Sequence, residues 1–285
     1  MDFFKRSNTK QAETRTGYIF EGHAVSDVGS VRSNNEDNYV IDTYMNQSSA
    51  DHSECGLVAP KAGKGGKGGW HLVGIFDGMG GGEKGEVAAN ETAEIFVETF
   101  RHFGRSTSAA VVEQSIRTAF LQANNRIIDL QCEGRVYGTT GTVLATDGRS
   151  MKIFHLGDSR AYLLRNGELF QLTRDQTLAQ MKLDAGLYGP DDPSVEADKH
   201  KLTEYIGRDW TRENLSPVEG QWMPVVPNDR ILLCSDGLYD MCTDCQIADI
   251  LAVGDKGNDT AQKLVKAALD HGGIDNVTCI VVNFR

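Results

Sequence analysis

The chain has 285 residues, and 40 acidic against 29 basic side chains give it a formal net charge of −11. Because 40% of the residues are hydrophobic and 24% are charged, the composition excludes a disordered or collagen-like chain. The acidic excess, with no local basic patch, argues against nucleic acid or an anionic membrane as a partner. No central linker divides the sequence, and single β-rich domains can reach about 250 residues, so we expect one domain.

The N-terminal part of the sequence predicts a soluble cytoplasmic protein. It has no apolar signal-peptide core, and no stretch approaches the roughly 18 apolar residues that span a bilayer. Residues 1–16 are polar and aperiodic, which predicts a flexible tail before a domain at 17–285. The six cysteines lack the dense, regular spacing of a disulfide framework, so we expect reduced thiols, and we expect a monomer.

The first half of the domain predicts strands followed by two helices. Apolar stretches indicate strands at 18–25, 39–42 and 71–76. Residues 43–70 are predicted to be a loop insertion, which ends in a run rich in glycine and lysine at 61–69. Apolar residues at helical spacing then predict amphipathic helices over 88–103 and 112–130.

The second half changes to short strands with hairpin turns. An antiparallel meander is predicted over the strands 142–146, 151–156, 161–164 and 169–173. A polar, partly helical segment at 176–207 follows. The remaining elements are a strand at 231–234, helices at 243–252 and 259–268, and a last strand at 277–283. This order of elements favours an α+β fold built on antiparallel sheets.

Acidic residues gather at the ends of the predicted strands. Asp77, Asp158 and Asp236 follow strands, whereas Glu36, Asp37 and Asp275 precede them. Since the end of one antiparallel strand lies beside the start of its neighbour, these acids can share one sheet edge. Carboxylates brought together repel and take up protons unless cations keep them ionised. Oxygen ligands without histidine or thiolate favour Mg²⁺ or Mn²⁺, and this many acids suit two ions about 3.5–4 Å apart.

Asp77-Gly78 is the pair that we expect to bridge the two ions. Glycine at position 78 would let its own carbonyl approach a metal. The structural alternative is a simple turn, because Asp-Gly is above all a turn signal. Asp147-Gly148, which lies between two short strands without an acidic neighbour, is assigned to such a hairpin.

The same residues, taken with their neighbours, resemble the metal-dependent protein serine/threonine phosphatases of type 2C, especially the bacterial members. Seven segments match the family in its order: DVGSVRSNNED at 27–37, FDGMGG at 76–81, GTTGT at 138–142, GDSRAY at 157–162, LTEYIG at 202–207, SDG at 235–237 and DNVT at 275–278. The resemblance implies a β-sandwich of two antiparallel sheets flanked by pairs of helices, with a dinuclear metal site at one end.

The resemblance also implies roles for individual residues. Arg32 matches the arginine that grips the substrate phosphate, and Asp37 would orient the attacking water. The implied metal ligands are Asp77, Asp236 and Asp275 for one ion, Asp77, the Gly78 carbonyl and Glu36 for the other, and Asp158 with Asp236 for a weaker third ion. The implied reaction is hydrolysis of phosphoserine and phosphothreonine in proteins phosphorylated by a serine/threonine kinase. By the same resemblance, segment 176–207 is a flap that tunes the choice of protein substrate.

Three departures from the family pattern are visible. Met79 stands where eukaryotic members often have a histidine proposed as general acid, which leaves that role unassigned. Gly82 and Asp175-Gln176 stand where bacterial members often have His and Asp-His. The insertion at 43–70 is longer than expected. None of these positions is among the implied metal ligands. The alternative function is a catalytically weak, phosphoprotein-binding pseudophosphatase, against which the presence of all the acidic ligands argues.

Other signals are weighed against this interpretation. Gly80–Gly85 satisfies the dinucleotide-binding pattern after a strand, but two helices follow where a βαβ unit needs a second strand. Cys242 and Cys245 have redox or zinc spacing without a second pair, and Ser159 lacks the final glycine of a nucleophile elbow. The seven histidines are scattered, so we expect surface or packing roles for them.

Overall fold

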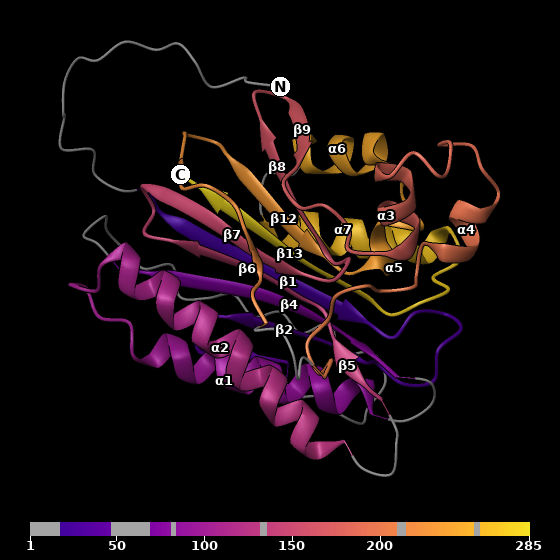
Figure 1. Cartoon of the computed structure of the whole chain (residues 1–285). Coiled ribbons are helices and arrows are strands. Elements are labelled where there is room, and N and C mark those ends of the chain that lie inside the picture. The colour runs from indigo at the N-terminus through magenta and orange to yellow at the C-terminus, as the bar shows by residue number, and fades with distance from the viewer. Residues whose placement is uncertain (1–17, 47–68, 81–83, 132–135, 210–214, 254–256) are drawn as a thin grey trace.

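Two antiparallel sheets face each other in the computed structural model, and helices cover their outer faces (Figure 1). The structure describes residues 18–46, 69–80, 84–131, 136–209, 215–253 and 257–285. Every strand pair between these residues is antiparallel, so the predicted α+β sandwich is confirmed. The predicted tail at 1–16, most of the predicted insertion (47–68) and Gly82 lie outside the described residues.

The smaller sheet has five strands. Its order is β1 (Phe20–Asp27), β13 (Val277–Phe284), β12 (Arg230–Cys234), β8 (Arg160–Arg165) and β9 (Glu168–Gln171). The larger sheet runs in the order β10 (Val218–Glu219), β7 (Ser150–Leu156), β6 (Gly141–Thr146), β4 (His71–Met79), β2 (Asp37–Ile41) and β3 (Tyr44–Met45), with β11 (Met223–Pro224) paired to β7 and β5 (Gly138–Thr139) to β4.

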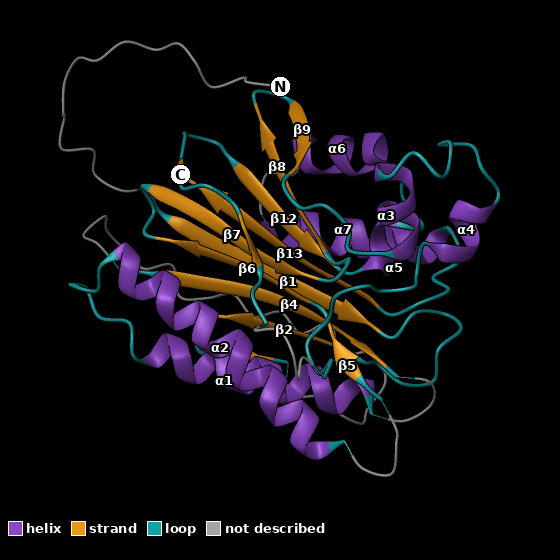
Figure 2. Cartoon of the chain, in the orientation of Figure 1, coloured by secondary structure: helices purple, strands orange, loops and turns teal. Residues whose placement is uncertain are grey.

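The helices form two layers and a separate lobe (Figure 2). The larger sheet is covered by α1 (Gly85–Arg101) and α2 (Ala109–Leu130), and the smaller sheet by α5 (Asp236–Tyr239), α6 (Asp244–Val253) and α7 (Gly257–Asp270). Two short helices, α3 (Leu178–Asp184) and α4 (Ser194–Asp198), lie in the segment predicted to be a flap. No described helix combines the length and apolar character that a membrane span requires.

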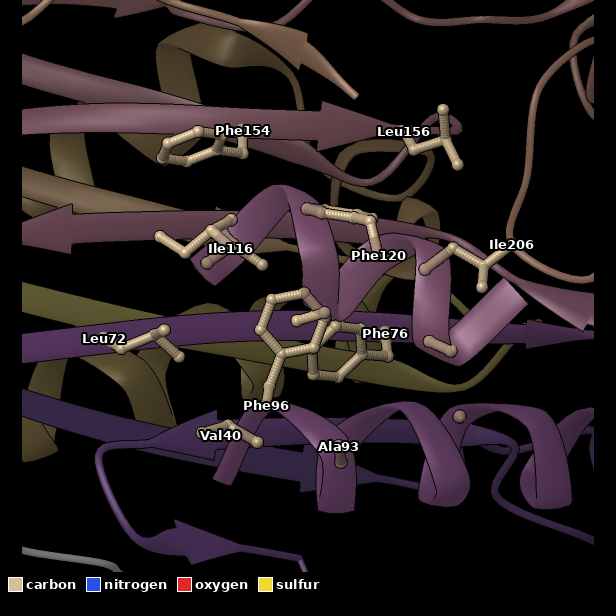
Figure 3. Packing of buried hydrophobic residues seen from close by; sticks show 14 of the residues in the cluster. Val40, Leu72, Phe76, Ala93, Phe96, Ile116, Phe120, Phe154, Leu156 and Ile206 are labelled. Atoms are coloured by element: carbon tan, nitrogen blue, oxygen red, sulfur yellow. The ribbon is translucent and has the colours of Figure 1, made fainter. Parts of the chain in front are cut away.

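The central strands are buried on both faces, which explains their nearly continuous apolar sequence. In β4, Leu72 and Phe76 face α1 and α2, whereas Val73 and Ile75 face the opposite sheet. Figure 3 shows Phe76, Phe96 and Phe120 packed between β4 and the two helices, with ring centroids 5.2 and 5.1 Å apart.

The predicted meander is wrong at one point, because β7 and β8 belong to different sheets. The hairpins β6–β7 and β8–β9 both form, but the chain changes sheets at residues 157–159. Phe154 packs under α1 and α2, whereas Tyr162 packs under α5 to α7. Hairpin signals in the sequence are local, and only the burial of these two faces against different helix layers decides the crossover.

Candidate metal and phosphate site

The predicted site residues lie at one end of the sandwich and come from both sheets. In the larger sheet, Asp37 on β2 is the register partner of Asp77 on β4. In the smaller sheet, Asp236 follows β12 and Asp275 precedes β13, and these two strands are neighbours. The expectation that the acids share one sheet edge is therefore corrected to two facing edges.

Asp37 links the two sheets. Its Oδ2 accepts a hydrogen bond of 2.8 Å from Ser235 Oγ at the end of β12. Its Oδ1 is buried and has no hydrogen-bond partner in the described structure. Because an unsatisfied buried oxygen is costly, this atom points to a ligand or water. The adjacent Glu36 is held by its backbone N–H, which donates to Asn276 Oδ1 at 2.8 Å.

The Asp77-Gly78 step is held by backbone contacts that leave no space for a side chain at position 78. Asp77 N–H donates to Thr140 Oγ1 at 3.0 Å, and Thr140 N–H donates back to the Asp77 carbonyl at 2.8 Å. Gly78 N–H donates to the Glu36 carbonyl at 3.1 Å. A Cβ on Gly78 would lie 2.3 Å from the carbonyl oxygen of Gly85, where α1 begins, so only glycine fits this approach.

Arg32 lies at the exposed rim of the site. Its Nη2 donates to Asp275 Oδ2 at 2.7 Å, while 54% of the Arg32 side chain remains exposed. Asp275 is also oriented locally, since its Oδ1 accepts the Asn276 N–H at 2.8 Å. A guanidinium that is held from one side and open on the other can still bind an anion with its fork of donors.

Asp158 is nearly buried, with 5% of its surface exposed, in the crossover between the sheets. Tyr239 OH donates to the Asp158 carbonyl at 3.2 Å. The ring of Tyr239 in turn lies 3.7 Å from the guanidinium carbon of Arg160, which pairs with Asp175 at the base of the flap segment. This chain of contacts fixes the backbone at Asp158.

The acids at the site end of the sandwich raise one another's pKa values, because each negative charge disfavours ionisation of its neighbours. Burial and the charge of Glu86 raise the pKa of Glu36 to about 7. Burial, with the nearby acids, raises the pKa of Asp37 to about 7 as well. Burial first, and then the neighbouring carboxylates, raise the pKa values of Asp77 and Asp158 far above the ordinary range. Hard oxygen donors with such pKa shifts fit divalent cations, which would favour the ionised forms.

His200 is a site residue that the sequence interpretation missed. Its Nδ1 lies 3.2 Å from Asp236 Oδ2 and its Nε2 lies 3.3 Å from Asp240 Oδ2. Within the described chain, these three side chains form a group whose ligand atoms lie within 4.8 Å of one another, whereas Asp77, Asp236 and Asp275 are not drawn together so closely. The spacing of Asp236 and Asp240, one helical turn apart, was the available signal.

A family model described as protein phosphatase 2C matches residues 21–182 of the chain. The chain belongs to this family. PstP, a serine/threonine protein phosphatase of Mycobacterium tuberculosis, is 32% identical over 272 residues, which cover 94% of this chain and 46% of PstP. The chain thus spans about half the length of this curated relative.

Solved structures of serine/threonine phosphatases have the same fold. The structure of Stp1 from Staphylococcus aureus has a TM-score of 0.77 at 25% identity, covering 97% of this chain and all of Stp1. The catalytic domain of PstP, solved in complex with two manganese ions, has a TM-score of 0.69 at 29% identity, covering 93% of this chain and 98% of that one. The chain is therefore homologous to manganese-binding serine/threonine phosphatases.

The signals set aside in the sequence have structural explanations. The strand β4 is followed by α1 and α2 in succession, and its neighbour β6 is antiparallel, so the βαβ unit of a dinucleotide site is absent from this part of the described structure. Cys242 and Cys245 are both free thiols. Ser159 is fully buried and its Oγ bonds to Thr140 Oγ1, as a packed residue does.

Proposed function

We propose that this chain hydrolyses phosphoserine and phosphothreonine in proteins with the help of Mg²⁺ or Mn²⁺. One observation carries the proposal: four acids converge at the end of the sandwich without an ion pair to any described residue. They are Glu36, Asp37, Asp77 and Asp158. Structural acids are ordinarily paired when buried, whereas acids that bind metal are not.

The residues present fit two divalent cations. Asp77, Asp236 and Asp275 would hold one ion. Asp77, the Gly78 carbonyl and Glu36 would hold the other, and Asp158 with Asp236 would hold a weaker third ion. Bound there, divalent cations supply a water of lowered pKa and neutralise charge on the phosphoryl oxygens.

The chain's own side chains would bind and orient the reactants. The unpartnered Asp37 Oδ1 would accept a hydrogen bond from the attacking water. This contact would direct the lone pair of the water oxygen at phosphorus. Arg32 would donate two parallel hydrogen bonds to the phosphate from its exposed side. The side chain of Met79 carries no dissociable proton, so we assign it no part in protonating the leaving oxygen.

The first test is hydrolysis of p-nitrophenyl phosphate and of a phosphothreonine peptide by the purified chain in Mn²⁺. We expect turnover of both esters, loss of turnover with a chelator, and loss in the Asp236→Ala variant. Turnover that survives chelation, or that Asp236→Ala leaves unchanged, contradicts the proposal. Tight phosphopeptide binding without turnover in any divalent metal would instead support a pseudophosphatase.

We further propose that segment 176–207 acts as a flap that selects protein substrates. It forms a lobe of its own from α3 and α4, and its His200 contacts Asp236 and Asp240 beside the site (Figure 1). Exchange of this segment for that of PstP should change the relative rates for different phosphoproteins. Equal rates before and after the exchange would contradict this role.

A further inference from the structure

Two exposed apolar side chains flank the ion pair of Arg32 and Asp275. Val31, directly before Arg32, is 68% exposed, and Ile274, directly before Asp275, is 52% exposed. Single exposed apolar residues are common on protein surfaces and require no explanation. These two differ because each is the immediate neighbour of a residue assigned to the site.

Two contacts hold the loops of these residues side by side. Ser30 N–H donates to the Gly273 carbonyl at 2.7 Å, and Arg32 Nη2 donates to Asp275 Oδ2 at 2.7 Å. The loops continue from the antiparallel strands β1 and β13, whose last register pair is Asp27 and Val277. Val31 is next in sequence to Ser30 and Arg32, and Ile274 is next to Gly273 and Asp275, so both contacts hold these two exposed residues near each other.

The close approach of these loops depends on Gly29. Its φ of +80° is a conformation that other residues adopt at a cost, and a Cβ there would lie 2.2 Å from the Asp275 carbonyl oxygen. The neighbouring Asp27 caps this turn, since its Oδ1 accepts the Gly29 N–H at 2.9 Å. The pairing of the two loops is thus built into the backbone and does not depend on the exposed side chains.

A third apolar side chain extends this surface. A Cβ on Gly272 would lie 3.8 Å from Ile274 Cγ2 and 3.9 Å from Met241 Sδ, so these two side chains border the same open position. Met241 is partly buried against the helix layer of the smaller sheet. We call Val31, Ile274 and Met241 the apolar rim.

We infer that the apolar rim binds an apolar side chain of the phosphoprotein substrate that lies within two positions of the phosphorylated residue. The inference rests on the proposed function, in which Arg32 holds the phosphate. Neighbouring Cα atoms are about 3.8 Å apart, and alternate residues of an extended chain about 6.6 Å apart. A side chain at that distance from the phosphoresidue reaches the residues next to Arg32 and Asp275, and its contact with the rim removes apolar surface from water.

The test compares two phosphothreonine peptides that differ only in having Leu or Ala at both positions two residues from the phosphothreonine. We expect the unaltered chain in Mn²⁺ to prefer the Leu peptide about fivefold in kcat/KM. The double variant Val31→Thr/Ile274→Thr, in which a hydroxyl replaces apolar surface at each position, should bring the two rates close to equal. Val111→Thr, a matched change at a residue of α2 that is 53% exposed, should keep the preference.

The outcomes separate this inference from the proposed function. Hydrolysis of p-nitrophenyl phosphate without preference between the peptides overturns the inference alone. No hydrolysis of any ester overturns the proposed function and the inference with it. The inference is also overturned if the double variant still prefers the Leu peptide. If the double variant keeps that preference but sediments differently from the unaltered chain, the apolar rim is a surface for self-association.

Discussion

Two regions of the molecule stabilise partly or fully buried acids in opposite ways. Between α2 and the larger sheet, Lys152 Nζ lies 3.2 Å from Glu113 Oε1 and 2.8 Å from Glu219 Oε2, and Arg117 contacts both acids. The hydrogen bond from Trp222 is the main cause that lowers the pKa of Glu113, and the hydrogen bond from Arg117 does the same for Glu219. We call these four charged residues the α2 ion-pair network.

At the end of the sandwich the pKa values move the other way. Burial and like charges raise the pKa values of Glu36, Asp37, Asp77 and Asp158, and they outweigh the opposing charges of Arg32 near Glu36 and of His200 near Asp158. The comparison teaches that burial of an acid does not by itself indicate its role. Acids with cations supplied by the chain hold elements together, whereas under the proposed function the acids at the end of the sandwich would bind cations from solution.

The largest expected effect separates activity from stability at the site. We expect Asp77→Asn to lower kcat/KM for p-nitrophenyl phosphate about a thousandfold, because a ligand shared by both ions is lost. In chelator, its free energy of unfolding should not fall, since one of several mutually repelling carboxylates is removed. Assays in Mn²⁺ and urea titrations in chelator measure the two quantities. A variant that is less stable by several kcal/mol would mean that Asp77 is a structural acid.

The buried side chain of His155 gives a second test of how burial shifts a pKa in this molecule. Burial lowers the pKa of His155 to about 4, and its ring contacts Thr142 Oγ1 at 2.9 Å and the Arg174 carbonyl at 3.1 Å. The unfolded chain, with an ordinary histidine pKa of about 6.5, takes up this proton first as the pH falls, so stability falls between about pH 6.5 and 4 and no further below. We expect about 3 kcal/mol of stability lost relative to His155→Gln across this window.

Urea titrations of both proteins at several pH values measure this difference. The difference between the wild-type chain and His155→Gln isolates the histidine from the other titrating groups. If the difference in the free energy of unfolding between the two proteins does not change with pH, His155 has the same pKa in the folded and the unfolded chain, and the expectation is wrong.

Substitutions in the α2 ion-pair network should lower stability and leave activity unchanged, the opposite of substitutions at the site. Replacement of Lys152 by Met leaves Glu113 and Glu219 with one cation between them, so we expect a loss of about 2–3 kcal/mol in the free energy of unfolding. kcat/KM should not change, because the network lies on the α2 side of the larger sheet. The double variant Lys152→Met/Glu219→Gln should recover part of the stability. An unchanged unfolding curve for Lys152→Met would contradict this role.

The smallest effect concerns the exposed ion pair at the rim. Arg32→Lys keeps the charge but loses the fork of donors, so we expect kcat/KM to fall about tenfold. The free energy of unfolding should stay nearly the same, because an ion pair this exposed contributes little. A variant with full activity would show that Arg32 acts as a simple charge and not as a bidentate donor.

Much of the fold was predictable because its signals are local. The helical spacing of the apolar residues in α1 and α2, and the apolar runs of β4, β12 and β13, placed these elements within a few residues of their bounds. The short strands β5, β10 and β11 and the helix α5 were missed, since four residues or fewer carry no periodicity. His200 was missed for a different reason: its acidic partners, Asp236 and Asp240, come from another element that lies far from it in the sequence.

The sequence by itself determined which residues have the chemistry of a metal and phosphate site, since strand ends and glycine turns set the positions of the acids and of Gly78. Only the tertiary structure decided how they meet. Two sheets, and not one edge, bring Asp37 to Ser235, and the crossover at Asp158 follows from burial against separate helix layers. The physical reason is that periodicity and turn chemistry act over a few residues, whereas burial and charge compensation depend on contacts between distant segments.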